Sequence, residues 1–470
     1  MQLYAISPVF FGILLLCTFG GLHRLLLFLC AMMPFGMLAV VGLPAIGGLS
    51  ILAVNATAAA LVAGGCLVLL SRLVRGQPIR IAPATLALLG FAAYAVFSAT
   101  VLVRLFAGET MVFALSREAV GVRVSTEFAW AKVWLGPSSS NISQTFYVLL
   151  ACGFFVVAAH VLRQKGVAFG ARCLALAATV NVGLGLLDLA ALDQLLATVR
   201  TASYSLANSA SVHGIPRIIG GFSEAASFGS ASAMFFGYFA STWLYSRKLS
   251  DGFLALGNGI FAVMALSSTG IIALAVVMVA LTPRLITTMP KRLRRNSLFT
   301  GSVGLAGIAI LVAVVLIFTD TAQTVTSIIN NLIFDKSTSS SGQERAAWAL
   351  GGLEALRDSW GLGVGTGSLR ANGLLFVMLG SVGIAGTALF VTFLWLAFSG
   401  RADSSQQQVL SSTRTGALAV LVSMLLAATV PDPSIQLIFL AALATAAKQS
   451  ATTPKRPQNL GSISKHSAVQ

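Results

Sequence analysis

The stretch "GLLFVMLGSVGIAGTALFVTFLWLAF", residues 373–398, contains no charged side chain. A helix of this length can cross a bilayer, because the hydrocarbon core is spanned by about 20 apolar residues. Similar uncharged runs recur along all 470 residues, of which 57% are hydrophobic and 9% are charged. Ordinary soluble domains are less apolar and carry about 25% charged residues. The sequence therefore predicts an all-α polytopic membrane protein.

The predicted spans form a single integral membrane domain, residues 1–448, followed by a disordered cytoplasmic tail, residues 449–470. They lie at about 7–22, 25–41, 54–73, 83–103, 146–162, 172–192, 228–245, 253–267, 270–283, 299–318, 373–398, 412–430 and 434–447. Residues 253–283 lie between two basic loops, so they are expected to cross twice or to form a re-entrant hairpin. We expect twelve or thirteen transmembrane helices.

The loops between these spans alternate in charge. One set, together with the tail, carries 20 Lys and Arg and two acidic residues, whereas the other set carries 10 Lys and Arg and 12 acidic residues. Basic loops of membrane proteins stay on the cytoplasmic side. The net charge of +16 therefore reports orientation, with the C-terminus inside, and does not indicate a nucleic-acid partner. Three loops are predicted on the outer face, at about 104–145, 193–227 and 319–372.

The sequence predicts neither a cofactor nor a metal site. The five cysteines are scattered singly in apolar segments and show no CxxC or Cys/His spacing. No Asp-x-Asp pair occurs in any of the three outer loops.

The largest outer loop, residues 319–372, contains the charged stretch "SGQERAAWALGGLEALRDSWGLGVGTGS", residues 341–368. Ser341 and Glu344 have the spacing of a helix capping box. Apolar residues follow at helical intervals: Ala349, Leu353, Leu356 and Trp360. The pattern predicts an amphipathic helix over 342–359. On the residues alone, this is either an interfacial helix with solvated charges or part of a functional site.

The alternating glycines that follow, "GLGVGTGS", do not match a dinucleotide-binding turn and follow no predicted strand. Two interpretations stay open for them. They either form a hinge or let the backbone approach a ligand closely.

The second outer loop brings three ionisable residues directly before an apolar span: His213, Arg217 and Glu224. A carboxylate near the edge of the membrane is costly unless it has a partner or a function. Glu224 is therefore either a functional group or the ion-pair partner of Arg217, which could also reach lipid phosphate. The small residues of "SEAASFGSASA" predict close helix packing.

Four stretches together resemble the O-antigen polymerase/O-antigen ligase superfamily of bacterial envelope enzymes. They are "PRIIGGFSEAASFGSASAMFFGYF" from 216, "GIFAVMALSSTGIIALAVVMVAL" from 259, "ERAAWALGGLEALRDSWGLGVGTGS" from 344 and "NGLLFVMLGSVGIAGTALFVTFL" from 372. The resemblance lies in their order and sidedness, and the first 200 residues are similar only in general hydropathy. It implies a GT-C-like helical fold with a large periplasmic loop, in a multi-pass protein of the bacterial inner membrane.

The resemblance also implies a reaction. A membrane glycosyltransferase would transfer glycan from a polyprenyl diphosphate carrier to a sugar hydroxyl during exopolysaccharide, O-antigen or capsule synthesis. Its partners would be the polyprenyl-diphosphate-linked oligosaccharide, membrane lipid, a chain-length regulator and a flippase. Without an Asp-x-Asp pair in the outer loops, we expect this reaction to be metal-independent.

The residues that would carry this chemistry follow from the matched motifs and from general physical chemistry. Arg217 and Arg345 match motif arginines, and guanidinium groups suit a diphosphate because they make bidentate charged contacts. Arg370 and Asn372 are further candidates for substrate binding. The acceptor proton would pass to Glu224 or His213.

Two alternatives to a polymerase stay open. Ligases of the superfamily carry a histidine about eleven residues before a Gly-x-x-Gly motif, but counting back from Gly383 reaches Asn372, which favours a polymerase over a ligase. A secondary transporter is the third reading, since transporters place ionisable residues at mid-membrane. Asp188 is the acidic candidate for that role, and it lies near the end of a predicted span.

Overall fold

The computed structural model of the chain describes residues 2–43, 49–77, 81–115, 132–202, 216–288 and 340–449. The predicted span 299–318 and His213 lie outside the described residues, as does the tail after Gln449. Within the described part the protein is mostly helical, with two small antiparallel sheets.

The helices of the first half are α1 (Ser7–Phe19), α2 (Leu22–Met32), α3 (Ala53–Val74), α4 (Pro83–Phe97), α5 (Val103–Leu105), α6 (Ser139–Lys165), α7 (Val167–Leu189) and α8 (Asp193–Ala197). A π-helical turn, Ser98–Leu102, joins α4 to α5. The second half contains α9 (Ala225–Ser246), α10 (Leu249–Met264), α11 (Ser268–Thr288), α15 (Ser340–Asp358), α16 (Leu374–Phe398), α17 (Ser404–Ala427) and α18 (Ile435–Gln449). One sheet joins β1 (Gln2–Leu3), β2 (Ala39–Leu43) and β3 (Leu49–Leu52), and the other joins β4 (Met111–Phe113) and β5 (Lys132–Trp134).

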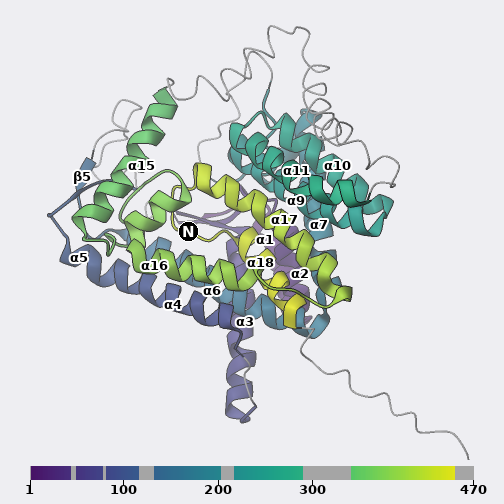
Figure 1. Cartoon of the computed structure of the whole chain (residues 1–470), viewed down its shortest axis with the longest axis horizontal. Helices are drawn as coiled ribbons and strands as arrows, with labels where there is room; N and C mark the ends of the chain where they lie inside the picture. The colour runs from purple at the N-terminus through teal and green to yellow at the C-terminus, as the bar shows by residue number, and fades with distance from the viewer. Residues whose placement is uncertain are drawn as a thin grey trace, which may run out of the picture.

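Seven helical segments within the described ranges are long and apolar enough to cross a membrane, so the chain is an all-α polytopic membrane protein. They are α3, the continuous segment Pro83–Leu105, α6, α7, α11, α16 and α17. Figure 1 shows α9, α10 and α11 gathered on one side, α4, α15 and α16 on the other, and α17 and α18 between them. The far end of α3 extends away from the helical body.

Five predicted spans on described residues are not among these seven segments: 7–22, 25–41, 228–245, 253–267 and 434–447. The first two of them are also interrupted by a turn or a strand. The apolar run 7–22 forms a helix of 13 residues, and the run 25–41 forms a helix of 11 residues followed by strand β2. At 1.5 Å per residue these helices are only about 20 and about 16 Å long, which is too short for the hydrocarbon core. Residues 39–43 pair with β1 and β3 because the sequence AVVGL supplies valines that favour strands.

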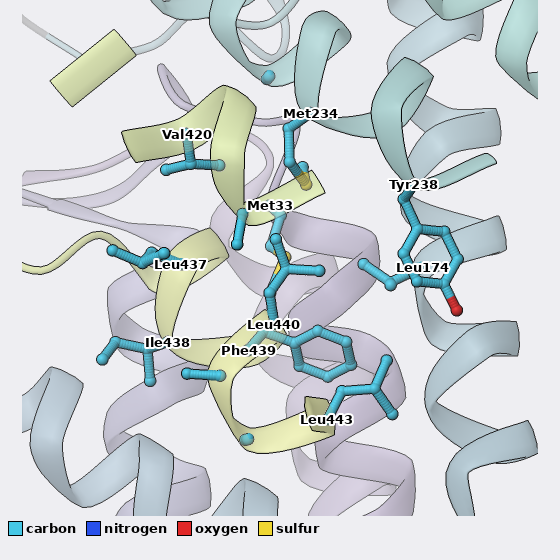
Figure 2. Packing of buried hydrophobic residues seen from close by; sticks show 14 of the residues in the cluster. Met33, Leu174, Met234, Tyr238, Val420, Leu437, Ile438, Phe439, Leu440 and Leu443 are labelled. Carbon is cyan, nitrogen blue, oxygen red and sulfur yellow. The ribbon is translucent and has the colours of Figure 1, made fainter. Parts of the chain in front are cut away.

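Helix α18 lies at the centre of the molecule. Nearly every side chain from Leu437 to Ala447 is buried, as expected for a helix that is apolar on all its faces. Figure 2 shows its side chains among residues of four other segments: Met33, Leu174, Met234, Tyr238 and Val420. At 15 residues, α18 is enclosed by protein, so its hydrophobicity reflects burial in the core.

The small residues of α9 allow close helix packing, as predicted. Helix α9 packs against α10, α11 and α17. A Cβ atom placed on Gly270 of α11 would lie 2.9 Å from the Cα atom of Gly229, and one placed on Gly237 would lie 3.0 Å from the carbonyl oxygen of Thr415. Since real side chains do not tolerate such approaches, these glycines set the spacing between the helices.

A carboxyl group is buried in the connection between α17 and α18. Burial raises the pKa of Asp432 to about 6, and the hydrogen bond from the Ser434 N–H at 3.2 Å opposes this only in part. The folded protein therefore binds a proton at Asp432 more tightly than the unfolded chain does, so acidification from pH 6 to about pH 4 favours folding.

We expect Asp432→Asn to increase the free energy of unfolding at pH 7.5 by up to about 3 kcal/mol, because the amide avoids the cost of burying a charge. The gain should shrink steadily below pH 6 and disappear only near pH 3, where the wild-type carboxyl is protonated in both the folded and the unfolded state. Thermal unfolding in detergent between pH 4 and 8 measures this, with Asp403→Asn as a control at an exposed carboxyl. A constant difference between variant and wild type across this range would contradict the prediction.

The amphipathic helix predicted over 342–359 is confirmed as α15, Ser340–Asp358. Its buried face was predicted wrongly, because Leu353 and Trp360 of the apolar stripe are 38% and 89% exposed. The buried positions are Trp348, Gly351, Gly352, Ala355 and Ser359. Glycines form much of this face, so α15 approaches α16 closely enough that a Cβ on Gly352 would meet the Phe376 carbonyl oxygen at 2.7 Å.

The alternating glycines form a strap, residues 361–368, that pairs with a break in α16 and is buried from Gly363 to Ser368. At Gly383 the backbone of α16 leaves the helical conformation. Three hydrogen bonds join the two segments: Val364 N–H to Gly380 O (2.8 Å), Gly365 N–H to Ser381 O (3.0 Å) and Ile384 N–H to Gly361 O (2.9 Å). They satisfy backbone groups that the break would otherwise leave without partners in an apolar environment.

The strap also contacts two helices from the first half of the chain. The Tyr94 hydroxyl of α4 donates to the Leu362 carbonyl at 3.0 Å, and Ser98 Oγ lies 3.0 Å from Thr366 Oγ1. From α6, the Asn141 amide donates to the Thr366 carbonyl at 2.8 Å. The strap therefore binds α4, α6 and α16 together beneath α15.

Candidate functional site

Arg217 lies in an extended segment, residues 216–222, that leads into α9. The segment rests on the turn between α10 and α11. Ile218 N–H donates to the Met264 carbonyl at 3.4 Å, and Arg217 Nε donates to the Ala265 carbonyl at the same distance. The turn between α10 and α11, residues 265–267, therefore lies beside Arg217. Two helices joined by a turn fit both arrangements predicted for 253–283.

Asp188 and Arg200 clamp this segment from the other side. One Asp188 oxygen accepts from the N–H groups of Ile219 at 2.7 Å and Gly220 at 2.9 Å. The other forms an ion pair of 2.8 Å with Arg200, whose guanidinium also donates twice to the Gly220 carbonyl. The side chains of Asp188 and Arg200 are only 11% and 6% exposed, so the clamp is shielded from water.

Asp188 and Arg200 can bind the segment in this way only because two of its residues are glycines, Gly220 and Gly221. Gly220 has a φ of +54°, which side chains other than glycine adopt at a cost. A Cβ atom on Gly221 would lie 2.4 Å from the Pro34 carbonyl oxygen. The Gly221 carbonyl accepts from Met37 N–H at 2.8 Å, so the segment is also fixed to the chain just before β2.

We expect Asp188→Asn to lower the free energy of unfolding by about 3 kcal/mol, because it leaves the buried Arg200 guanidinium without its ion-pair partner. Adding Arg200→Met should recover part of this loss, since removal of both charges also removes the cost of burying one. Thermal or SDS-induced unfolding of the single and double variants in detergent measures both effects. Equal stability of the wild type and the Asp188→Asn protein would contradict the clamp.

Arg217 and Arg345 influence each other electrostatically although they belong to different loops. Partial burial lowers the pKa of the Arg217 guanidinium, the charge of Glu224 opposes this, and the positive charge of Arg345 adds to the lowering. The three side chains are therefore within electrostatic range of one another. Arg345 lies in the second turn of α15 and is half-buried.

An ion pair between Arg217 and Glu224, one of the alternatives left open by the sequence, is not observed. Within the described residues, ion pairs shorter than 4.0 Å join only Lys132 to Glu354 and Arg200 to Asp188. Glu224 is exposed at the N-cap position of α9, where its side chain makes no capping hydrogen bond. Its carboxylate is thus not used within the described part of the fold.

Glu224 lines a pocket of about 280 Å³ between α9, α11, α17 and the start of α18. Apolar residues such as Phe222 and Met424 cover part of its wall. Six lining residues supply hydroxyl or amide groups: Ser227, Ser230, Thr269, Ser423, Ser434 and Gln436. Ser423 Oγ is buried and has no hydrogen-bond partner among the described residues. A wall with this mixture suits a hydroxylated ligand with apolar faces.

Arg370 and Asn372, the other candidates for substrate binding, both contribute to the scaffold of the site. The Arg370 guanidinium stacks on the indole of Trp348 at 5.0 Å and donates to the Leu115 carbonyl at 3.3 Å. Trp348 lies one turn after Arg345, so this stacking helps to hold the part of α15 that carries Arg345. Asn372 donates to the Leu426 carbonyl at 3.2 Å, next to the pocket residue Ala427.

The clamp between Asp188 and Arg200 was not predicted from the sequence, where Asp188 was a candidate mid-membrane charge and Arg200 had no assigned role. The available signal was a pair of opposite charges on either side of a helix end, which predicts an ion pair but does not reveal the backbone groups that the two side chains bind.

No family model matches the chain, and no curated protein matches it. The protein is a polytopic, all-α membrane protein in which Arg217, Arg345 and Glu224 lie within electrostatic range of one another, with Glu224 lining a hydroxyl-lined pocket.

Proposed function

We propose that the chain is a polysaccharide polymerase of the outer face of the bacterial inner membrane. It would transfer glycan from a polyprenyl diphosphate carrier to a hydroxyl of another lipid-linked repeat unit. The observation that carries this proposal is that Arg217 and Arg345, from two separate loops, lie within electrostatic range of one another, and neither forms an ion pair within the described residues.

The chemistry requires positive charge where the carrier leaves. The acceptor oxygen attacks the anomeric carbon, the bond from that carbon to the diphosphate oxygen breaks, and the diphosphate keeps the electron pair. Two guanidinium groups in a partly dehydrated site would stabilise that growing negative charge, the interaction that usually contributes most to catalysis. Bidentate contacts from arginine also hold the diphosphate in a fixed orientation.

Glu224 would receive the proton of the attacking hydroxyl. Its carboxylate is exposed, unpaired within the described residues, and lines the pocket in which an acceptor sugar would lie. General-base catalysis by a positioned carboxylate contributes about a hundredfold to ten-thousandfold to the rate. The hydroxyl groups around Ser423 supply hydrogen-bond partners for the sugar.

The proposal predicts that the purified protein in lipid nanodiscs converts polyprenyl-diphosphate-linked repeat units into chains of several units and releases free polyprenyl diphosphate. Gel electrophoresis of the glycan and chromatography of the lipid measure the two products. Transfer of glycan to a different lipid acceptor, without chain growth, would indicate a ligase. Unchanged lipid-linked substrate would contradict both enzymatic functions.

A matched variant tests the role of Glu224 in this assay. Glu224→Gln keeps the size of the side chain but cannot accept the proton, so the rate should fall at least about a hundredfold. Because the exposed side chain has no partner in the described fold, its thermal stability should match the wild type. A variant with full activity would assign proton acceptance to another group.

A further inference from the structure

A second pocket, of about 410 Å³, lies between the β4–β5 hairpin and the C-terminal half of α15. It shares no lining residue with the pocket beside Glu224. Eight residues line it: Glu109, Thr110, Met111, Lys132, Trp134, Glu354, Arg357 and Asp358. Five of the eight are charged, which sets this pocket apart from the uncharged spans and makes a hydrocarbon ligand unsuitable.

Two side-chain contacts hold the pocket in shape. Lys132 of β5 forms an ion pair with Glu354 of α15. Thr110, next to β4, donates to Asp358 at 2.5 Å. Together they attach both strands of the hairpin to the helix, so the walls are set before any ligand arrives.

Three other lining side chains are not used by the described part of the fold. The indole of Trp134 is 64% exposed although it belongs to a strand. The Glu109 carboxylate and the Arg357 guanidinium form no hydrogen bond or ion pair with any described residue. An exposed aromatic ring beside groups of both charges offers an apolar platform together with strong hydrogen-bond donors and acceptors.

We infer that this pocket binds a segment of the glycan. The bound segment would lie some way along the glycan from the glycosidic bond that the enzyme forms. The inference rests on the proposed function. The flat apolar face of a sugar ring can stack on Trp134, while neighbouring hydroxyls pair with Glu109 and Arg357. Three carboxylates against two cations make the lining negative overall, which favours neutral or amino-sugar units over polyanionic glycan.

Binding by the full-length protein tests this directly, without depending on catalysis. The probe is a set of oligosaccharides of two to three repeat units, cleaved from the surface polysaccharide of the cells that carry the gene. Saturation-transfer NMR in detergent should detect binding to a protein with Arg217→Ala and Arg345→Ala, which no longer holds the carrier diphosphate. Adding Trp134→Ala should weaken that binding at least about tenfold, as expected for loss of a central tryptophan contact.

Trp395→Ala serves as the matched control, since Trp395 is 66% exposed on the apolar helix α16. It should leave binding unchanged. Equal binding with and without Trp134 would overturn the inference. So would strong quenching of Trp134 fluorescence by brominated lipids in nanodiscs, judged against Trp134→Phe, because that result would assign the ring to the membrane interface.

These results separate this inference from the proposed function. If the reconstituted wild type makes no polymer but the pocket still binds oligosaccharide through Trp134, only the proposed reaction fails. If polymer forms and Trp134→Ala changes neither oligosaccharide binding nor the length distribution of the product, only the second site fails.

Discussion

Replacing Arg217 or Arg345 with Ala is expected to reduce polymer synthesis by about a hundredfold to a thousandfold, the usual cost of losing one group that stabilises charge in a transition state. Both guanidinium groups act on the same diphosphate in the proposed reaction. The double variant should therefore lose less than the product of the two single effects, because residues that act as a unit are not additive. The reconstituted assay with lipid-linked repeat units measures each rate.

Arg217→Lys and Arg345→Lys refine this prediction. Lysine keeps the charge but cannot make bidentate contacts, so activity should fall between the wild type and the alanine variants. Arg104→Ala is a suitable control, because Arg104 is exposed on α5 and donates to the Thr100 carbonyl of its own helical segment. Full activity in either alanine variant, with normal abundance in the membrane, would refute the diphosphate clamp.

Substituting Gly367 with Ala should lower the free energy of unfolding by about 2 to 5 kcal/mol. Gly367 has a φ of +81°, and a Cβ atom there would lie 2.4 Å from the Ser140 carbonyl oxygen. The left-handed conformation costs about 1 to 2 kcal/mol for a residue with a side chain. Displacing the backbone at the start of α6 adds about 1 to 3 kcal/mol. Together these are a large fraction of the stability of a typical domain.

Gly108→Ala is the matched control. Gly108 has a φ of +77°, but a Cβ atom there would meet no other atom within 4 Å. It should therefore show only the conformational cost of about 1 to 2 kcal/mol. Unfolding of both variants by heat or SDS in detergent measures the difference. If Gly367→Ala is no less stable than Gly108→Ala, the strap is not packed as described.

Hydropathy predicted most of the helices, because an uncharged run long enough to span a bilayer almost always forms a helix in lipid. It failed at 7–22 and 25–41, where Gly20 and Gly21 separate two short helices and the run then continues as β2. The rule measures apolar length, and it does not register a turn or a strand within that length.

The burial of α15 was predicted wrongly for a related reason. Periodicity arguments assume that large apolar side chains mark the buried face. Here Gly351 and Gly352 lie in the contact with neighbouring elements, while Trp360 is exposed. Because glycine has no side chain, a helix face that is formed by glycines does not appear in the hydropathy pattern. Close packing by glycine is visible only once the partner helix is known.

The candidate site was predicted in part. Arg217, Arg345 and Glu224 came from resemblance and from charge near the membrane, and the fold places all three within electrostatic range. Their catalytic roles stay predictions. Asp188 and Arg200 could not be assigned, because their function depends on contacts with Ile219 and Gly220 that no local pattern specifies.

The glycine strap also dictates an order of assembly during synthesis. Its Leu362 carbonyl accepts a hydrogen bond from Tyr94, 268 residues earlier in the chain, and its Gly361 carbonyl accepts one from Ile384, just after the break in α16. Helices α4 and α6 are therefore synthesised long before the strap. Until the strap is made, Ser98 and Asn141 lack the hydrogen bonds that they form with Thr366 in the folded protein. Such distant pairings close late, so we expect the early helices to remain separable until α16 has left the ribosome.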